Sequence, residues 1–197
     1  MDFSDPFVIY MGVRKTATLL PASIKNYEAQ PPGCFHQVAP QFQNIPGTTR
    51  VGHYSFEAPP PNLTGKLCGF IFRSHIVFSF LPLANKLKQL IEAKIILEPK
   101  KHQSKLNSPS CADSLICLNE PISNVMSVKG GAIHVPQLKT ITIVDVTHRV
   151  ADWLTGARLN NGFLLVGGVV FPFMESHDFC VTWFNCKLEI KYIEKVN

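Results

Sequence analysis

The stretch from Thr140 to Gly168 constrains the fold of this chain more than any other part of the sequence. Its first seven residues, TITIVDV, alternate in polarity with the period of two that is typical of a β-strand. Val146, Val150, Trp153 and Leu154 then recur at helical spacing on one apolar stripe. The pattern therefore predicts a strand that runs directly into a short amphipathic helix.

Single residues mark the boundaries of these elements. We predict Thr147 as the N-cap of the helix, and Asp145 as an acceptor for backbone N–H groups at the helix N-terminus. Gly156 stands where helices end in a left-handed residue, and Gly162 closes an Asn-Asn-Gly turn before the apolar strand 163–166. We interpret the polar and aromatic residues of this stretch as scaffold. The structural set is Asp145, Thr147, Val150, Trp153, Gly156 and Gly162.

Further strands are predicted on both sides of this stretch. Residues 68–80, CGFIFRSHIVFSF, place four phenylalanines on one face and mixed residues on the other. Residues 91–98 alternate as well and end at Pro99, and the polar residues 100–114 are expected to form a loop. With about eight to ten short strands and one capped helix, the sequence predicts an all-β fold, an antiparallel β-sandwich of jelly-roll type.

The chain divides into a short N-terminal segment and one larger unit. Residues 15–197 are expected to form a single β-sandwich domain. Residues 1–14 are predicted to be either the first strand or an arm that adds to the open sheet edge of another subunit. The assembly arm consists of Phe7, Val8, Ile9, Tyr10 and Met11.

Composition excludes several classes of protein. The net charge of +5 comes from 19 scattered Lys and Arg residues, which argues against a nucleic-acid partner. No segment approaches the length of a membrane span, and the start lacks the basic and apolar regions of a signal peptide. We therefore expect a protein that stays in the cytoplasm, is exported by an unusual route, or is part of a longer chain. Charged residues make up only 17% of the sequence, which favours a surface covered by a partner.

The six cysteines leave two interpretations open. They could be buried free thiols that act as small hydrophobic residues, or they could form disulfides at an oxidising surface. The cysteines are Cys34, Cys68, Cys111, Cys117, Cys180 and Cys186. Their spacing does not match a zinc site.

Catalysis has no support in the residue pattern. No second acid accompanies Asp145, no two histidines have metal-binding spacing, and no Gly-rich phosphate loop or G-x-S-x-G motif occurs. We therefore predict no catalytic residue, no metal and no cofactor. Trp153 is expected in the core, whereas Trp183 is a candidate for stacking on a ligand.

Several of these motifs together resemble a known family. The block Val144-Asp145-Val146-Thr147, with Val150, Trp153 and Gly156, is similar to the V-D-V-T-x-x-V-x-x-W-x-x-G signature of DNRLRE-type domains. Asn161-Gly162-Phe163-Leu164-Leu165 resembles the N-x-G-x-x-L segment that follows it, and growth-factor pro-segments carry a similar block. The short members known from spore-forming bacteria begin much like residues 16–21. The resemblance implies a non-catalytic β-sandwich of extracellular or surface-associated proteins, some of which resemble carbohydrate-binding modules.

Two functions follow as expectations. The first is a structural or adhesive protein of a cell or spore surface, which assembles with copies of itself through the arm and the cysteines. The second is a carbohydrate-binding module that recognises a surface polysaccharide. An enzyme is the least supported of the three classes.

Overall fold

The computed structural model describes residues 12–30, 34, 38–57, 67–105, 110–136, 140–168 and 177–195. These ranges contain ten strands, two short 3-10 helices and one α-helix. In chain order they are β1 (Arg14–Leu19), β2 (Ser23–Ala29), η1 (Pro40–Phe42), β3 (Thr49–Glu57), β4 (Leu67–Val77), η2 (Leu81–Leu83), β5 (Leu87–Ser104), β6 (Ala112–Leu118), β7 (Gly130–His134), β8 (Thr142–Asp145), α1 (Thr147–Leu154), β9 (Phe163–Gly167) and β10 (Phe179–Glu194).

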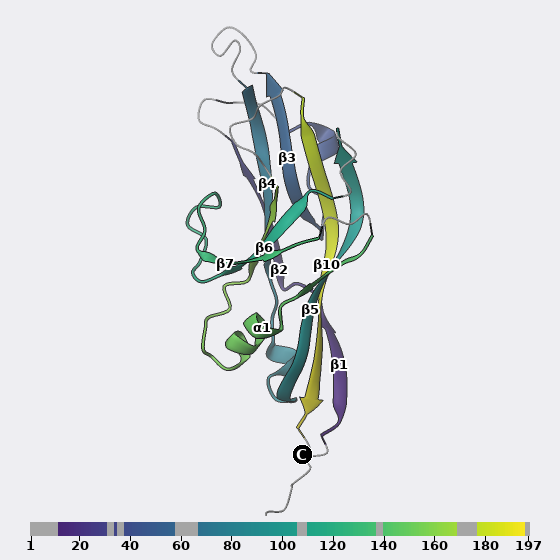
Figure 1. The fold of residues 1–197 in the computed structure, drawn as a ribbon, viewed down its shortest axis with the longest axis vertical. Coiled ribbons are helices and arrows are strands. Elements are labelled where there is room, and N and C mark those ends of the chain that lie inside the picture. The colour runs from purple at the N-terminus through teal and green to yellow at the C-terminus, as the bar shows by residue number, and fades with distance from the viewer. Residues whose placement is uncertain are drawn as a thin grey trace, which may run out of the picture.

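All strand pairs in the described part of the chain are antiparallel, which confirms the predicted all-β fold. The hydrogen-bonded order is β7-β6-β9-β4-β3-β10-β5-β8, with β1 added to β10 and β2 added to β4. The two longest strands, β5 and β10, pair over nearly their full lengths and run along the long axis of the molecule (Figure 1).

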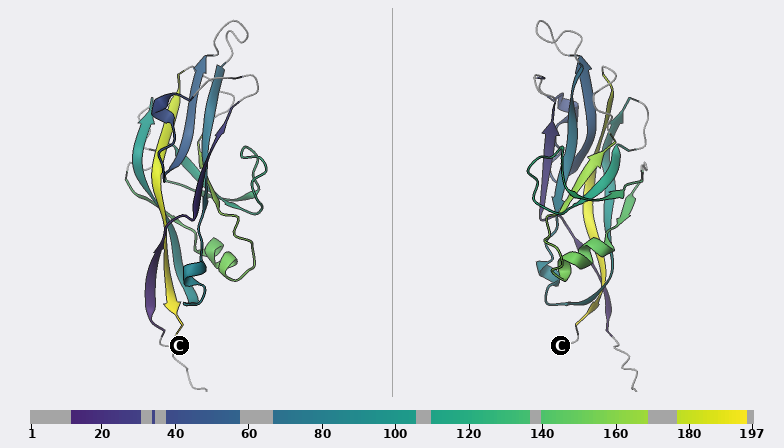
Figure 2. Two further views of the ribbon diagram at one scale, coloured as in Figure 1. Left: turned by 180° about the vertical axis from the view of Figure 1, so that it is seen from behind. Right: turned by 60° about the vertical axis from the view of Figure 1, so that its left-hand side comes forward.

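Strand pairing divides part of the molecule into two layers. Over Arg73–Ile76, β4 pairs with β2 on one side and β9 on the other, so β2, β4, β9, β6 and β7 form one layer. β10 pairs with β5 along one side and with β3 and then β1 along the other, so β1, β10, β5 and β8 form the second layer. β3 joins the layers because it pairs with both β4 and β10. Helix α1 lies against β5, in the same half of the molecule as β1 (Figure 2).

The larger hydrophobic cluster draws residues from both layers and from α1, and we call it the sandwich core. Val150 and Trp153 of α1 belong to it, as predicted from the helical stripe. The Trp153 ring contacts Phe163 of β9 at 4.8 Å and Phe80 at 6.0 Å between ring centroids. The helix therefore closes the cluster through the residues that define its apolar face.

A second cluster, the aromatic core, is formed by residues of β3, β4 and β10 together with Cys34 and Phe42. Its buried members are Cys34, Phe42, Phe56, Cys68, Phe70, Phe72, Val181 and Trp183. Val38, Ala39 and Ile45 pack against it from a segment that contains only η1. This core is thus covered by an irregular segment instead of a second sheet.

One fully buried charge lies beside the aromatic core. The Arg50 guanidinium forms an ion pair with Glu28, donates to the backbone oxygen of Phe42, and lies 4.1 Å from the ring centroid of Phe72. Burial lowers the pKa of Arg50, while Glu28 opposes that shift. Nothing in the local sequence around Arg50 signals this arrangement, because its partners are 8 to 22 residues distant along the chain.

The structure corrects the predicted cap of α1. The N-cap position is Val146, and the hydroxyl of Thr147 contacts the N–H and C=O of Ala93 in β5 at 2.9 Å and 3.3 Å. The backbone N–H of Thr147 instead donates to Asp145 Oδ1 at 2.8 Å, in agreement with the acceptor role expected for Asp145. The Thr147 hydroxyl is therefore used to tie the helix to the sheet.

The glycines of this stretch adopt the expected conformations. Gly156 and Gly162 have φ values of +74° and +79°. A side chain at Gly162 would also approach the backbone oxygen of Ile76 within 2.5 Å. The second position therefore requires glycine for its conformation and for space.

The strand predicted to end at Pro99 continues to Ser104, so the expected loop over residues 100–114 begins later than predicted. The register between β10 and β5 shifts here, since Trp183 pairs with Lys101 and Phe184 pairs with Pro99. A β-bulge accommodates a proline because the missing N–H is not needed by the ladder at that point.

Candidate functional site

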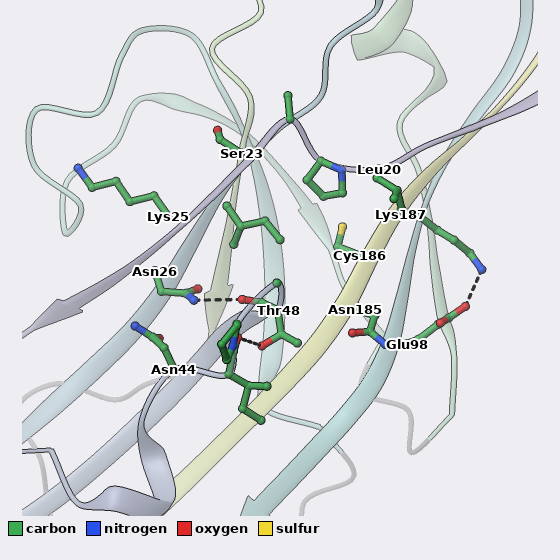
Figure 3. Close-up of a pocket in the computed structure, with 16 residues that line it drawn as sticks. Leu20, Ser23, Lys25, Asn26, Asn44, Thr48, Glu98, Asn185, Cys186 and Lys187 are labelled. Atoms are coloured by element: carbon green, nitrogen blue, oxygen red, sulfur yellow. Dashed lines mark hydrogen bonds and ion pairs between the residues drawn. The ribbon is translucent and has the colours of Figure 1, made fainter.

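A groove of about 830 Å³ opens between β2 and β10, and we call it the β2–β10 groove (Figure 3). Three segments line it besides the two strands: the corner between β1 and β2, the turn that precedes β3, and Glu98 of β5. The lining residues are Leu20, Pro21, Ala22, Ser23, Ile24, Lys25, Asn26, Asn44, Ile45, Pro46, Gly47, Thr48, Glu98, Asn185, Cys186 and Lys187.

The groove exists because two strand edges lack a neighbour in the described part of the chain. Along one side of β10, β3 pairs up to Phe184 and β1 pairs from Leu188 onward, which leaves residues 185–187 without a strand partner on that side. β2 pairs only with β4, so its other edge has no ladder either. Backbone N–H and C=O groups at such edges can pair with an added strand.

The crossing of the first two strands creates this opening. β1 belongs to the layer of β10 and β2 to the layer of β4, so the chain passes between layers at Leu20–Ala22. Pro21 lacks a backbone N–H and cannot continue a ladder. The corner thus forms one end of the groove.

Hydrogen bonds hold the opposite end in place. Asn26 Nδ2 donates to the backbone oxygen of Thr48 at 3.0 Å, and Asn26 Oδ1 accepts from the backbone N–H of Arg50 at 3.0 Å. The Thr48 hydroxyl donates to the oxygen of Ile45 at 2.8 Å, and Gly47 has a φ of +73°. The turn 45–48 is therefore fixed to β2 by a half-buried amide and to itself by a hydroxyl (Figure 3).

The charges in the groove are few. Lys187 Nζ contacts Glu98 Oε1 at 2.6 Å across the β10–β5 pair, with both side chains about one-third exposed. Lys25 Nζ lies 4.9 Å from the centroid of the Tyr27 ring. Glu98 is the one carboxylate among the described lining residues. These residues therefore contain no pair of carboxylates for hydrolysis.

Cys186 contributes a thiol to the groove wall. Only 5% of this residue is exposed, and burial raises the pKa of the thiol to about 12. The thiol is neutral at ordinary pH and is a poor nucleophile. Within the described ranges, no three His, Cys, Asp or Glu side chains form a group that could hold a metal ion.

The structure corrects the expected role of Trp183. The side chain is fully buried in the aromatic core, and its Nε1 donates to the backbone oxygen of Gln43 at 3.0 Å. Neither face of the ring can stack on a ligand in this position. The positions of Trp183 and Phe184 on opposite faces of β10 did not predict that Trp183 is buried, because residues on both faces of the strand are buried here.

The cysteines follow both of the interpretations that the sequence left open. Cys34 is bonded to Cys68 and Cys111 is bonded to Cys180. Cys117 and Cys186 are buried free thiols. The proposed arm residues Phe7, Val8, Ile9, Tyr10 and Met11 lie outside the described residues.

Sequence reasoning did not identify the groove. Its residues lie in four separate segments that strand pairing brings together. The available signals were the Leu-Pro-Ala break after the first strand and the Ile-Pro-Gly turn at residues 45–47, which mark where regular pairing stops.

The sequence comparisons found no relative: no protein-family model matches the chain, and no curated protein is significantly similar to it. In the described part of the chain, no helix has the length and apolar character needed to cross a membrane.

Proposed function

We propose that this protein is a non-catalytic structural or adhesive component of a cell or spore surface, which assembles by strand addition. In this proposal the arm of one copy, residues 7–11, enters the β2–β10 groove of another. The observation that carries it is a pair of strand edges, on β2 and β10, that face one groove and have no neighbouring strand among the described residues. An added strand would supply hydrogen-bond partners to these edges.

The starting point of the arm suits contact with a neighbour. The N–H of Glu194 donates to the oxygen of Val13 at 2.9 Å. The arm therefore joins the described chain at the end of the β1–β10 pair where Arg14 lies opposite Ile193. This end is one pole of the elongated molecule (Figure 1). Residues 1–11 can span at most about 36–40 Å when extended, which is enough to reach a second copy in contact with that pole.

The disulfides support an oxidising location. Two of the three potential cysteine pairs are bonded, and such bonds persist mainly outside the reducing cytosol. The resemblance to DNRLRE-type domains points to the same kind of location and remains a prediction. A surface assembly of disulfide-bonded subunits would withstand unfolding better than one held by packing alone.

A polysaccharide remains the second candidate partner. Sugar-binding sites use exposed aromatic rings as stacking platforms. Among the residues that the structure describes, no aromatic side chain lines the β2–β10 groove, and Trp183 is buried. The groove therefore favours a peptide strand over a sugar.

The test replaces residues 7–11 with a Gly-Ser sequence of equal length. We expect the variant to remain a folded monomer by circular dichroism and light scattering, while the unchanged protein forms oligomers visible by electron microscopy. A matched variant carries five Gly or Ser substitutions at exposed residues between β6 and β7 that do not line the groove, and it should still assemble: Glu120, Pro121, Ser123, Met126 and Lys129. Equal assembly of the arm variant would refute the proposal.

A second experiment addresses the groove itself. A synthetic peptide of residues 1–11 should compete with the arm and block assembly. Substituting Leu20, which is 74% exposed at the groove rim, with Trp should weaken binding of this peptide. Leu159, 80% exposed and not among the lining residues, provides the control substitution to Trp. Unchanged peptide binding in Leu20→Trp would place the arm elsewhere.

A further inference from the structure

The Cys111–Cys180 disulfide lies beside a histidine and a threonine. His102 of β5 is directly paired with Thr182 of β10, and His102 Nδ1 lies 2.9 Å from Thr182 Oγ1. The same threonine oxygen accepts the backbone N–H of Cys111 at 3.0 Å. His102 Nδ1 is also 3.8 Å from Cys111 Sγ. Thr182 thus fixes both the imidazole and the cysteine, with a ring nitrogen facing one sulfur of the bond.

The two sulfur-bearing residues of this bond differ in exposure. Cys111 is buried, with 4% exposed, whereas Cys180 is partly exposed. Since Cys180 is the more exposed residue, we expect a thiolate from solution to reach its Sγ more readily than Cys111 Sγ. In thiol–disulfide exchange the accessible sulfur is attacked, and the other sulfur leaves more readily when its thiolate is stabilised.

The other disulfide lacks both features. Cys34 and Cys68 are 1% and 0% exposed and belong to the aromatic core. In the described part of the chain, no histidine or other proton donor contacts either sulfur. This bond provides an internal reference for the reactivity of the first.

We propose that Cys111–Cys180 is a thiol-exchange site, at which a small thiol or a cysteine of another protein forms a mixed disulfide with Cys180. The incoming thiolate attacks Cys180 Sγ, a new S–S bond forms there, and the bond to Cys111 breaks. The electron pair of that bond leaves on Cys111 Sγ as a thiolate, and the N–H of protonated His102 transfers its proton to it. The products are a mixed disulfide on Cys180, a Cys111 thiol and a neutral imidazole.

This activity goes beyond the proposed assembly and does not depend on the arm. It would allow covalent attachment of a thiol-bearing partner at a defined position of β10. Cys117 and Cys186 of a second copy are unsuitable as the attacking groups, because both are buried and burial raises the pKa of each thiol. The partner must bring an exposed thiol of its own.

The experiment exposes the folded protein to reduced glutathione, stops the reaction by alkylation, and maps the modified cysteines by mass spectrometry. We expect glutathione on Cys180, an alkylated Cys111, and an intact Cys34–Cys68 bond. Glutathione mainly on Cys111, or opening of Cys34–Cys68 first, would overturn the proposal. This readout needs no variant, so it holds even if substitutions impair folding.

Substitution of the histidine tests its role. His102→Gln should slow opening of Cys111–Cys180 by about a hundredfold, the low end of what a positioned proton donor contributes. His134 is exposed, and His134→Gln is the matched control with an unchanged rate expected. A merely destabilising change would open the bond faster, so an unchanged or faster reaction in His102→Gln would exclude the proton-donor role.

Discussion

The sandwich core and the aromatic core are closed in different ways. Strands of two layers and one helix surround the sandwich core, and its two cysteines, Cys117 and Cys186, are not bonded. The aromatic core is covered on one side by residues 38–45, which contribute no strand. That segment is held by separate bonds from Trp183 and Arg50, while the Cys34–Cys68 disulfide lies in the same core.

The difference shows what an irregular cover requires. A strand in a ladder has its backbone groups satisfied by its neighbours, and apolar packing then suffices to hold it. A segment outside the ladder needs individually placed partners for its backbone oxygens, such as those of Phe42 and Gln43. We therefore expect the aromatic core to depend on a few polar and covalent bonds, and the sandwich core to depend on burial.

The largest effect should come from removing the disulfide of the aromatic core. Cys34 and Cys68 are separated by 34 residues. A disulfide that closes a loop of this length stabilises a fold by about 4 kcal/mol, because it lowers the conformational entropy of the unfolded chain. Cys34→Ala/Cys68→Ala should lower the free energy of unfolding by about that amount in urea titrations. Cys117→Ala in the sandwich core is the control and should cost less than about 2 kcal/mol. Equal losses would remove the distinction between the two cores.

The next effect concerns the buried guanidinium. Glu28→Gln leaves the Arg50 charge without its counter-charge, and breaking a buried pair in this way costs about 3–5 kcal/mol. Because 38% of the Glu28 side chain is exposed, we expect about 3 kcal/mol in the same titrations.

A second substitution checks that the cost arises from the charge. Glu28→Gln/Arg50→Met removes both members of the pair and should recover part of the lost stability, since an apolar side chain needs no partner. A double variant less stable than Glu28→Gln would show that the hydrogen bond to Phe42 matters more than the charge.

The fold class was accessible from the sequence because it depends on local patterns. The alternation in residues 68–80 and the helical stripe of α1 report which side chains face a core, and the structure has β4 and α1 there. The end of β5 could not be predicted from such patterns. Pro99 is compatible with the strand because β5 has a bulge next to it, where the register with β10 skips Lys100, and that pairing joins residues far apart in the sequence.

The candidate site depended almost entirely on such distant pairing. The cysteine pattern allowed disulfides but could not assign them, since Cys111 meets Cys180 only when β10 lies beside the start of β6. The β2–β10 groove arises where β1 and β2 enter different layers, which a local pattern does not encode. Burial of Trp183 likewise requires the segment around Gln43 to cover β10.

The smallest effect tests whether packing alone seals the sandwich core. Burial raises the pKa of Cys186 from 9.0 to about 12, so above pH 9 the unfolded chain loses this proton while the folded protein keeps it. The unfolded state then binds fewer protons, and stability falls as the pH rises. Between pH 8 and 10 the loss from this thiol should be about 1.4 kcal/mol. Cys186→Ala should show a pH dependence weaker by that amount, measured as the difference between two urea titration series. Identical slopes would mean that the thiol ionises through the β2–β10 groove, and that the sandwich core is less well closed than its strand pairing indicates.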